Sequence, residues 1–107
     1  MNITPENLDK FKQRMRIYHS HSDEALRSYL ESSYLFLKNK CGDFSLEGDN
    51  QGTELMYERA RYAYHDNLEY FDEHFMSMVI SFSLTNLSLK EDEDVENSIQ
   101  TARDNFW

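Results

Sequence analysis

The sequence predicts an all-α fold, a compact bundle of four helices followed by a flexible acidic C-terminal tail. The chain has 107 residues with three glycines and one proline, too few turn-forming residues for a sheet with many turns. Its apolar residues recur at helical spacing through most of the chain. At this length we expect one helical domain at residues 1–88 and a tail at residues 89–107 that stays disordered until it binds a partner.

The first helix is predicted from its start signals and from one apolar face. Thr4 is a capping residue, and Pro5 suits the first helical position. Leu8, Phe11 and Met15 follow at spacings of three and four, so they share one face. We expect this short helix to end near residues 14–16.

The second helix follows a linker at residues 17–21 and is capped by Ser22, with acidic residues in its first turn. It runs to about Asn39 or Lys40, because Gly42 supplies a stop signal. Its apolar line is formed by Leu26, Leu30, Ser33, Leu37 and Cys41, and it is widened by Tyr29, Tyr34 and Phe36.

A loop at residues 42–52 holds all three glycines and no basic residue, so we expect it to be mobile or to face a partner. Phe44 or Leu46 is its candidate anchor. The third helix starts at Thr53 and reaches about Asp66, where the chain breaks.

The fourth helix spans about residues 70–85, and its apolar face predicts the centre of the bundle. That face is formed by Phe71, Phe75, Met78, Val79 and Phe82. The acidic segment from Asn86 onward is weakly helical at best, near residues 95–103, and ends in two aromatic residues.

The third helix has more apolar surface than one core covers. At about 100° per residue, the apolar side chains of the segment YERARYAYHDN and its neighbours cover roughly 220° of the helix. Arg59 lies inside this arc and needs an acidic partner, because a buried unpaired guanidinium is costly. Glu31 or Asp23 of the same chain and a carboxylate of another subunit are the alternatives.

The charge of the chain is divided unevenly. The formal net charge is −9; residues 1–41 carry seven Lys and Arg against five Asp and Glu, and residues 42–107 carry four against fifteen. This division argues against a general DNA-binding surface, which needs a concentrated basic patch. It suits a contact in which the basic half of one copy meets the acidic half of the next.

The residue patterns that carry chemistry are absent from the sequence. Four histidines occur without zinc-ligand spacing, and no phosphate-binding glycine loop or nucleophile motif is present. The single cysteine, Cys41, fits a reducing compartment, and no apolar run is long enough to span a membrane. We therefore expect that the protein is not an enzyme, that it binds no metal or other cofactor, and that it has no membrane partner.

Two segments carry a resemblance to a known family. RMRIYHSHSDEALRSYLESSYLFLKNKCG has a turn, an acidic stretch, a helix rich in leucine and aromatic residues, and a glycine; ELMYERARYAYHDNLEYFDEHFMSMVISFSL has an arginine-containing aromatic helix, a polar turn and an apolar helix. Both resemble the head-tail connector proteins, or adaptors, of long-tailed phages. Met15 stands where the family often has leucine, and the acidic tail is longer than the family pattern.

The resemblance implies a structural protein of the virion, located at the head-tail interface and assembled in the host cytoplasm. Such a protein forms a ring, usually dodecameric, beneath the portal protein and joins the DNA-filled head to the stopper or tail. The isolated protein can stay monomeric until the portal templates the ring. DNA would pass through the ring without specific binding.

Site residues follow from the resemblance and from the wide apolar arc together. We expect a subunit interface at Tyr57, Arg59, Tyr62 and Tyr64, which would also pack against the core. By an aromatic-anchor argument, we expect docking to the portal or another partner through a set of tail residues. They are Glu91, Asp92, Glu93, Asp94, Phe106 and Trp107.

Two other functions remain open from the residues alone. A small acidic inhibitor or nucleic-acid mimic would use the acidic loop and tail to occupy a basic groove, which explains the charge but not the apolar arc. The second alternative is a monomeric helical domain without a portal partner.

Overall fold

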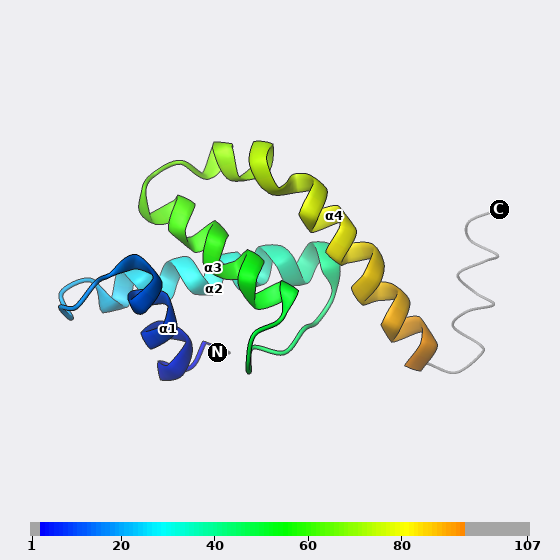
Figure 1. Cartoon of the computed structure of the whole chain (residues 1–107), viewed down its shortest axis with the longest axis horizontal. Helices are drawn as coiled ribbons and strands as arrows, with labels where there is room; N and C mark the ends of the chain where they lie inside the picture. The colour runs from blue at the N-terminus through cyan, green and yellow to red at the C-terminus, as the bar shows by residue number, and fades with distance from the viewer. Residues whose placement is uncertain (1–2, 94–107) are drawn as a thin grey trace.

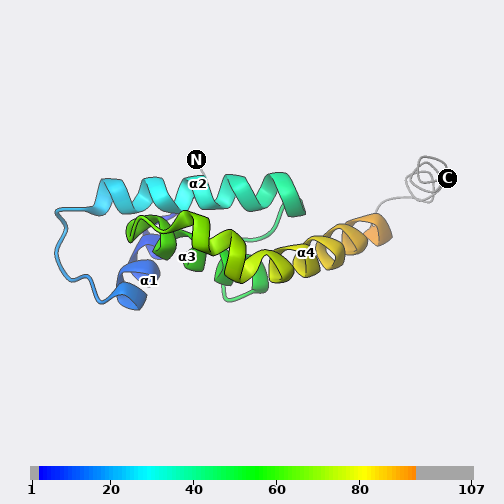
Figure 2. The same ribbon diagram turned by 90° about the horizontal axis from the view of Figure 1, so that it is seen from above.

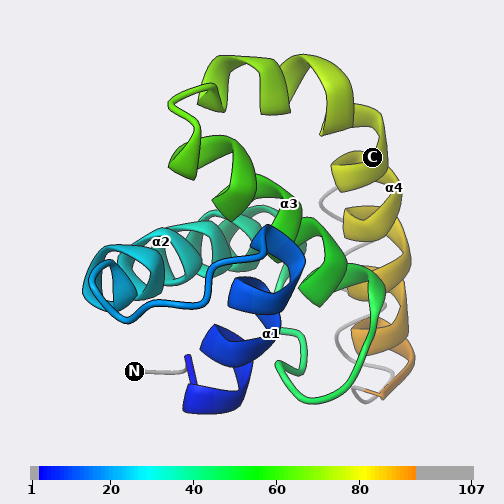
Figure 3. The same cartoon turned by 60° about the vertical axis from the view of Figure 1, so that its left-hand side comes forward.

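The four predicted helices are present in the computed structural model, which describes residues 3–93. They are α1 (Pro5–Met15), α2 (Asp23–Cys41), α3 (Gln51–Tyr64) and α4 (Leu68–Glu93). The described residues form no strand, so the predicted all-α bundle of four helices is confirmed. Helices α2, α3 and α4 pack against one another in pairs, and α1 packs against α2 (Figure 1). Figure 3 shows α1 beside the loop that connects α2 and α3.

Capping boxes start α1 and α3. The Thr4 hydroxyl accepts a hydrogen bond from the Asn7 N–H (3.1 Å), and the Asn7 side chain accepts one from the Thr4 N–H (3.1 Å). Asn50 and Thr53 make the same reciprocal pair, at 2.9 and 3.0 Å. The predicted start of the third helix at Thr53 is therefore wrong, because Asn50 is the cap and α3 begins at Gln51.

Residues in the left-handed region end α1 and α3. Arg16 has φ 57°, and the following Ile17 N–H donates back to the last turn of α1 at 2.9 Å. Asp66 has φ 59°, and the Asn67 N–H donates to the Tyr62 carbonyl at 2.8 Å. The predicted break at Asp66 and Asn67 is thus confirmed.

The start of α2 differs from the prediction in one detail. Ser22 occupies the N-cap position, but its side chain makes no capping hydrogen bond. Its backbone carbonyl accepts the Leu26 N–H at 2.8 Å, so the helix begins as expected at Asp23. The acidic first turn, with Asp23 and Glu24, complements the positive end of the helix dipole.

The loop between α2 and α3 is anchored by its own apolar side chains. The Phe44 ring lies between Tyr34 and Phe82, with ring centroids 5.2 and 5.6 Å away. Leu46 is half-buried and packs against the core as well, so both candidate anchors are confirmed. Gly52, in the first turn of α3, lies against the Phe44 ring, and any side chain at this position would overlap the ring.

An aromatic cluster joins α2, α3 and α4 at the centre of the bundle. Phe71 is fully buried, and its ring centroid lies 6.3 Å from Phe36, 6.0 Å from Tyr62 and 5.2 Å from Phe75. Of the face predicted for the fourth helix, Phe71, Val79 and Phe82 are buried and Phe75 is partly buried, whereas Met78 is exposed, so the prediction that this helix forms the centre holds only in part. Other fully buried side chains of the core are Phe11, Leu26, Leu30, Leu37, Met56 and Ala60.

The fourth helix is longer than predicted. It continues to Glu93, so the expected end near Thr85 is wrong, and residues 86–93 are helical. No proline or glycine interrupts this segment. The C-terminal half of α4 extends past the end of α2 (Figures 1 and 2). The rest of the predicted tail, residues 94–107, lies outside the described residues.

Side chains of α4 bind the carbonyl groups at the C-terminal end of α2. The Asn86 amide donates to the backbone carbonyls of Cys41 (2.8 Å) and Asp43 (2.9 Å). The Ser83 hydroxyl donates to the Lys40 carbonyl (3.1 Å). The last carbonyls of a helix lack partners within that helix, so these bonds both cap α2 and fix α4 against it.

Replacing Asn86 by alanine is expected to lower the free energy of unfolding by about 1–2 kcal/mol, because both carbonyl acceptors lose their partner. Urea denaturation followed by circular dichroism measures the change. The matched control is Thr85→Ala, since the exposed Thr85 hydroxyl bonds only within α4, to the Ser81 carbonyl. An equal loss in both variants would contradict the capping role of Asn86.

Some of the basic and acidic residues of the two halves pair with each other within one protomer. Among the described side chains, three ion pairs join the basic N-terminal part to the acidic remainder, and all three are at least partly exposed. They are Lys10 with Asp49 (3.8 Å), Arg14 with Glu54, and Lys38 with Asp43 (3.5 Å). Exposed pairs of this kind contribute little stability. The uneven charge is therefore not reserved for contacts between copies.

Candidate partner-binding site at the α3–α4 turn

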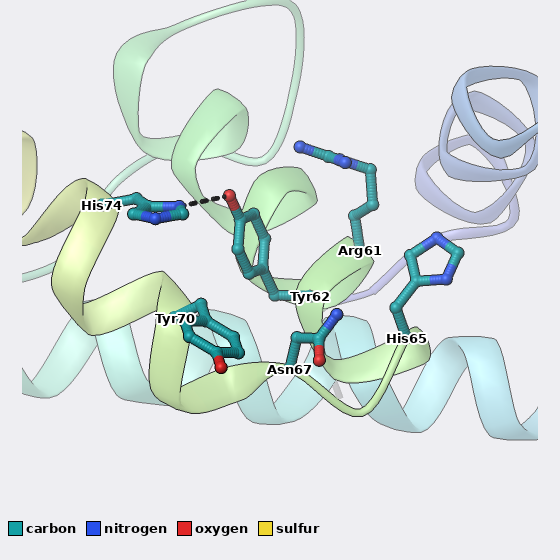
Figure 4. Close-up of a pocket in the computed structure, with 6 residues that line it drawn as sticks. All are labelled: Arg61, Tyr62, His65, Asn67, Tyr70 and His74. Carbon is teal, nitrogen blue, oxygen red and sulfur yellow. Dashed lines mark hydrogen bonds between the residues drawn. The ribbon is translucent and has the colours of Figure 1, made fainter.

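The sharp turn between α3 and α4 brings the last turn of α3 against the first two turns of α4. Asp66 reverses the chain in the left-handed region, and α4 begins two residues later at Leu68. Side chains from both helix ends surround an open pocket of about 270 Å³ (Figure 4). We call it the α3–α4 pocket; its lining residues are Arg61, Tyr62, His65, Asn67, Tyr70 and His74.

A hydrogen bond across the pocket fixes two of its side chains. The Tyr62 hydroxyl and the His74 Nδ1 atom are 3.0 Å apart (Figure 4). The Tyr70 ring stacks on the same imidazole, with centroids 6.2 Å apart and an angle of 30° between the planes. Because Tyr62 also packs on Phe71, this wall of the pocket continues directly from the aromatic cluster.

The positive charge of the pocket is partly compensated. Arg61 donates two hydrogen bonds to one carboxylate oxygen of Glu58, at 3.0 and 2.6 Å, and its guanidinium lies 5.2 Å from the centre of the Tyr62 ring. Both Arg61 and Glu58 are partly exposed. The six lining residues include no serine, cysteine or carboxylate. The pocket thus presents hydrogen-bond donors and aromatic faces to solvent.

Apolar side chains continue the surface beside the pocket. Tyr64 is 38% exposed and meets the Tyr29 ring edge to face at 6.4 Å, and Leu68 and Tyr70 are 37% and 47% exposed. Tyr62 is half-buried. Tyr70 and His74 were not among the predicted site residues; their i, i+4 spacing just after the predicted break could have indicated a shared exposed face.

Tyr57 does not belong to the predicted subunit interface. It is 1% exposed, its ring stacks on Phe11 at 6.3 Å, and its hydroxyl accepts a hydrogen bond from the Asn7 amide at 3.1 Å. The Arg14 guanidinium lies 4.8 Å from the ring centre. The prediction is wrong here because α1 covers this face of α3, and the docking position of a short helix leaves no local signal in the sequence.

Arg59 is half-buried and makes neither of the predicted ion pairs within the chain. Its Nη1 atom donates to the Ser33 hydroxyl (3.2 Å), and its guanidinium lies 4.2 Å from the centre of the Phe36 ring. Asp23 pairs with Lys12 instead, at 2.7 Å.

No carboxylate of residues 3–88 lies within ion-pair distance of Arg59, so the prediction of a pair to Glu31 or Asp23 is wrong. Burial lowers the pKa of Arg59, and the negative charge of Asp72 partly opposes this shift. A guanidinium has five N–H donors. Among the described residues, the side chain of Arg59 donates a hydrogen bond to the Ser33 hydroxyl alone.

The predicted docking residues are only partly described. Glu91, Asp92 and Glu93 form the end of α4. Asp94, Phe106 and Trp107 lie outside the described residues.

Other predicted features have simple structural roles. Among the side chains of residues 3–88, no three His, Cys, Asp or Glu come together as a metal site, and none of the described helices is long and apolar enough to cross a membrane. His19 and His21 stack on each other at 5.0 Å in the linker before α2. Cys41 is buried and directs its thiol at the Val79 carbonyl (3.6 Å), and burial raises its pKa.

A comparison of the chain with models of known protein families, with curated proteins and with solved structures gives no match.

Proposed function

We propose that this chain is a structural subunit that binds other protein subunits, and specifically a head-tail connector of a long-tailed phage. In this proposal, copies form a dodecameric ring beneath the portal protein, and the ring joins the head to the stopper or tail. The resemblance of the two quoted segments supports the phage assignment. The exposed apolar surface of the protomer supports a function in protein assembly.

One observation carries the proposal. Nine large hydrophobic side chains are exposed on the described protomer, and seven of them lie between Tyr64 and Leu87, at the end of α3 and along α4. Single exposed apolar residues are ordinary, whereas a concentration on neighbouring elements is typical of protein interaction surfaces. The other two are Tyr18 and Leu35.

The α3–α4 pocket and Arg59 add polar contacts to this surface. Tyrosine and arginine are enriched at the centres of protein interfaces, because each combines a large contact area with hydrogen bonding. In the proposal, Tyr62, Tyr64 and Tyr70 contact a neighbouring subunit, and Arg59 binds a carboxylate from it.

The decisive experiment mixes the purified protein with tail-less heads that carry the portal protein, and electron microscopy records what forms at the portal vertex. We expect a ring of added density. Heads without portal are the control for unspecific attachment. Unchanged portal vertices at saturating protein would contradict the connector function.

Net charge favours one other function, an acidic inhibitor or nucleic-acid mimic. Residues 42–107 carry fifteen acidic and four basic side chains. Such a protein would compete with DNA for a basic host protein at low salt and lose this competition at high salt. Salt-sensitive competition without head binding would favour this function over the connector.

A further inference from the structure

The outer side of α4 carries an apolar stripe formed by Ile80, Leu84 and Leu87, which we call the α4 stripe. These residues follow at spacings of four and three, so they lie on one face of the helix. Their exposed fractions are 53%, 70% and 43%. Val79 and Phe82, on another face of the same turns, are buried in the core. Helix α4 is therefore apolar on two faces, and the protomer covers only one.

The α4 stripe belongs to a segment without charge. No Lys, Arg, Asp or Glu occurs from His74 to Leu89, although 29% of the chain is charged. The solvent side of a surface helix normally carries charged residues. One face of this segment meets the end of α2 through Ser83 and Asn86, and the distal end of α4 continues past α2 (Figures 1 and 2). This face has the composition of an interface.

A second uncharged stripe runs along the outer side of α2, and we call it the α2 stripe. All of its members are exposed, and they follow at spacings of three and four: Ala25, Ser28, Ser32, Leu35 and Asn39. Figure 2 shows α2 along one edge of the molecule, with the other helices on its inner side. Alanine and serine make this surface shallow, and Leu35, 52% exposed, projects from it.

We propose that the α4 stripe of one copy packs on the α2 stripe of a second copy. The inference rests on the proposed function, which requires contacts between copies. A row of bulky side chains forms a ridge, and a row of small ones forms a groove that lets two helices approach closely. Neither stripe places an unpaired charge in the interface. Because the two stripes differ, the contact is heterologous and can repeat around a ring.

The charges at the helix ends favour a parallel arrangement of the two helices. In sequence, the acidic run at residues 91–94 follows the α4 stripe, and Lys38 and Lys40 occupy the last turn of α2. Asp23 and Glu24 occupy the first turn of α2. A parallel arrangement brings the acidic run to the lysines, whereas an antiparallel one brings it to like charges. In the parallel register that pairs Leu87 with Leu35, Leu84 faces Ser32.

Two variants of the full chain, Ser32→Cys and Leu84→Cys, test this contact. Both positions are exposed, so the core is unchanged, and circular dichroism checks the fold. The variants are mixed at high concentration with a short bis-maleimide. We expect about tenfold more cross-linked dimer from the mixture than from either variant alone, because facing thiols have a high effective concentration. The unchanged chain measures the background from the buried thiol of Cys41.

The matched control is Tyr18→Cys mixed with Leu84→Cys, since Tyr18 is 84% exposed and lies outside both stripes. Equal yields from this mixture and from the Ser32→Cys mixture would overturn the inference. A high yield from Leu84→Cys alone would overturn it too, because α4 would then pair with α4. Rings on heads without the mixed cross-link would contradict this inference only, and a mixed cross-link without head binding would contradict the connector function only.

Discussion

Replacing Phe71 by alanine is expected to lower the free energy of unfolding by about 3–5 kcal/mol, the range for large-to-small changes of buried aromatic residues. Phe71 is fully buried and contacts aromatic rings of α2, α3 and α4, so the cavity would open where the three helices meet. Small domains have only about 5–15 kcal/mol of stability. We therefore expect a much lower midpoint of urea denaturation.

The adjacent Tyr70 supplies the matched control. Its side chain is 47% exposed and stacks on His74 at the surface, so Tyr70→Ala is expected to cost about 1 kcal/mol or less. Both variants remove one aromatic ring from the same turn of α4. Similar losses in the two would show that the aromatic cluster does not hold the bundle together.

Ending the chain after Glu93 is expected to abolish attachment to portal-bearing heads while the helical domain stays folded. The missing residues 94–107 include Phe106 and Trp107, the proposed aromatic anchors for the portal. The cut has to follow Glu93, because a cut at residue 86 would remove the Asn86 bonds to the end of α2. Decoration of heads is counted by electron microscopy, and circular dichroism follows the fold.

Two full-length variants separate the contributions to docking. One replaces Phe106 and Trp107 by serine, and the other replaces the acids at residues 91–94 by their amides. We expect the first to lose attachment and the second to retain part of it with a weaker dependence on salt. Normal decoration of heads by the shortened chain would refute a docking role for residues 94–107.

The sequence predicted the helices well because their start and stop signals are local. Thr4 with Pro5, the acidic first turn of α2 and the break at Asp66 each act within a few residues, and each is present in the structure. The start of α3 was misplaced by two residues because Asn50 and Thr53 both suit a cap, and only the geometry shows which one serves.

The contacts between distant segments could not be predicted in the same way. Tyr57 and Tyr64 belong to one apolar arc of α3, but α1 covers the first and leaves the second exposed. Arg59 lies in the same arc and was expected to pair with a carboxylate, yet it packs on Phe36 and binds Ser33. Which side of an apolar helix is covered depends on where a neighbouring segment docks, and periodicity carries no such information.

The packing of the extra length of α4 could not be predicted either, because it too depends on contacts between distant segments. Asn86 is an ordinary polar residue in the sequence, and its value for the fold arises only from the carbonyls of Cys41 and Asp43 that it meets. The α4 stripe could have been noticed from the uncharged segment that contains it. Its exposure, however, depends on which face of α4 packs against the core, where Val79 and Phe82 are buried.

The bonds from Asn86 and Ser83 to the end of α2 also determine how the protein responds to mechanical load. A partner that pulls on the distal end of α4 would strain these three hydrogen bonds first, and through them the axis of α2. The aromatic rings around Phe71 lie near the N-terminal end of α4, away from the pulled end. Phe71 is fully buried, so these contacts would be loaded later. A load on α4 would thus reach α2 at its C-terminal end, through side-chain bonds to backbone carbonyls.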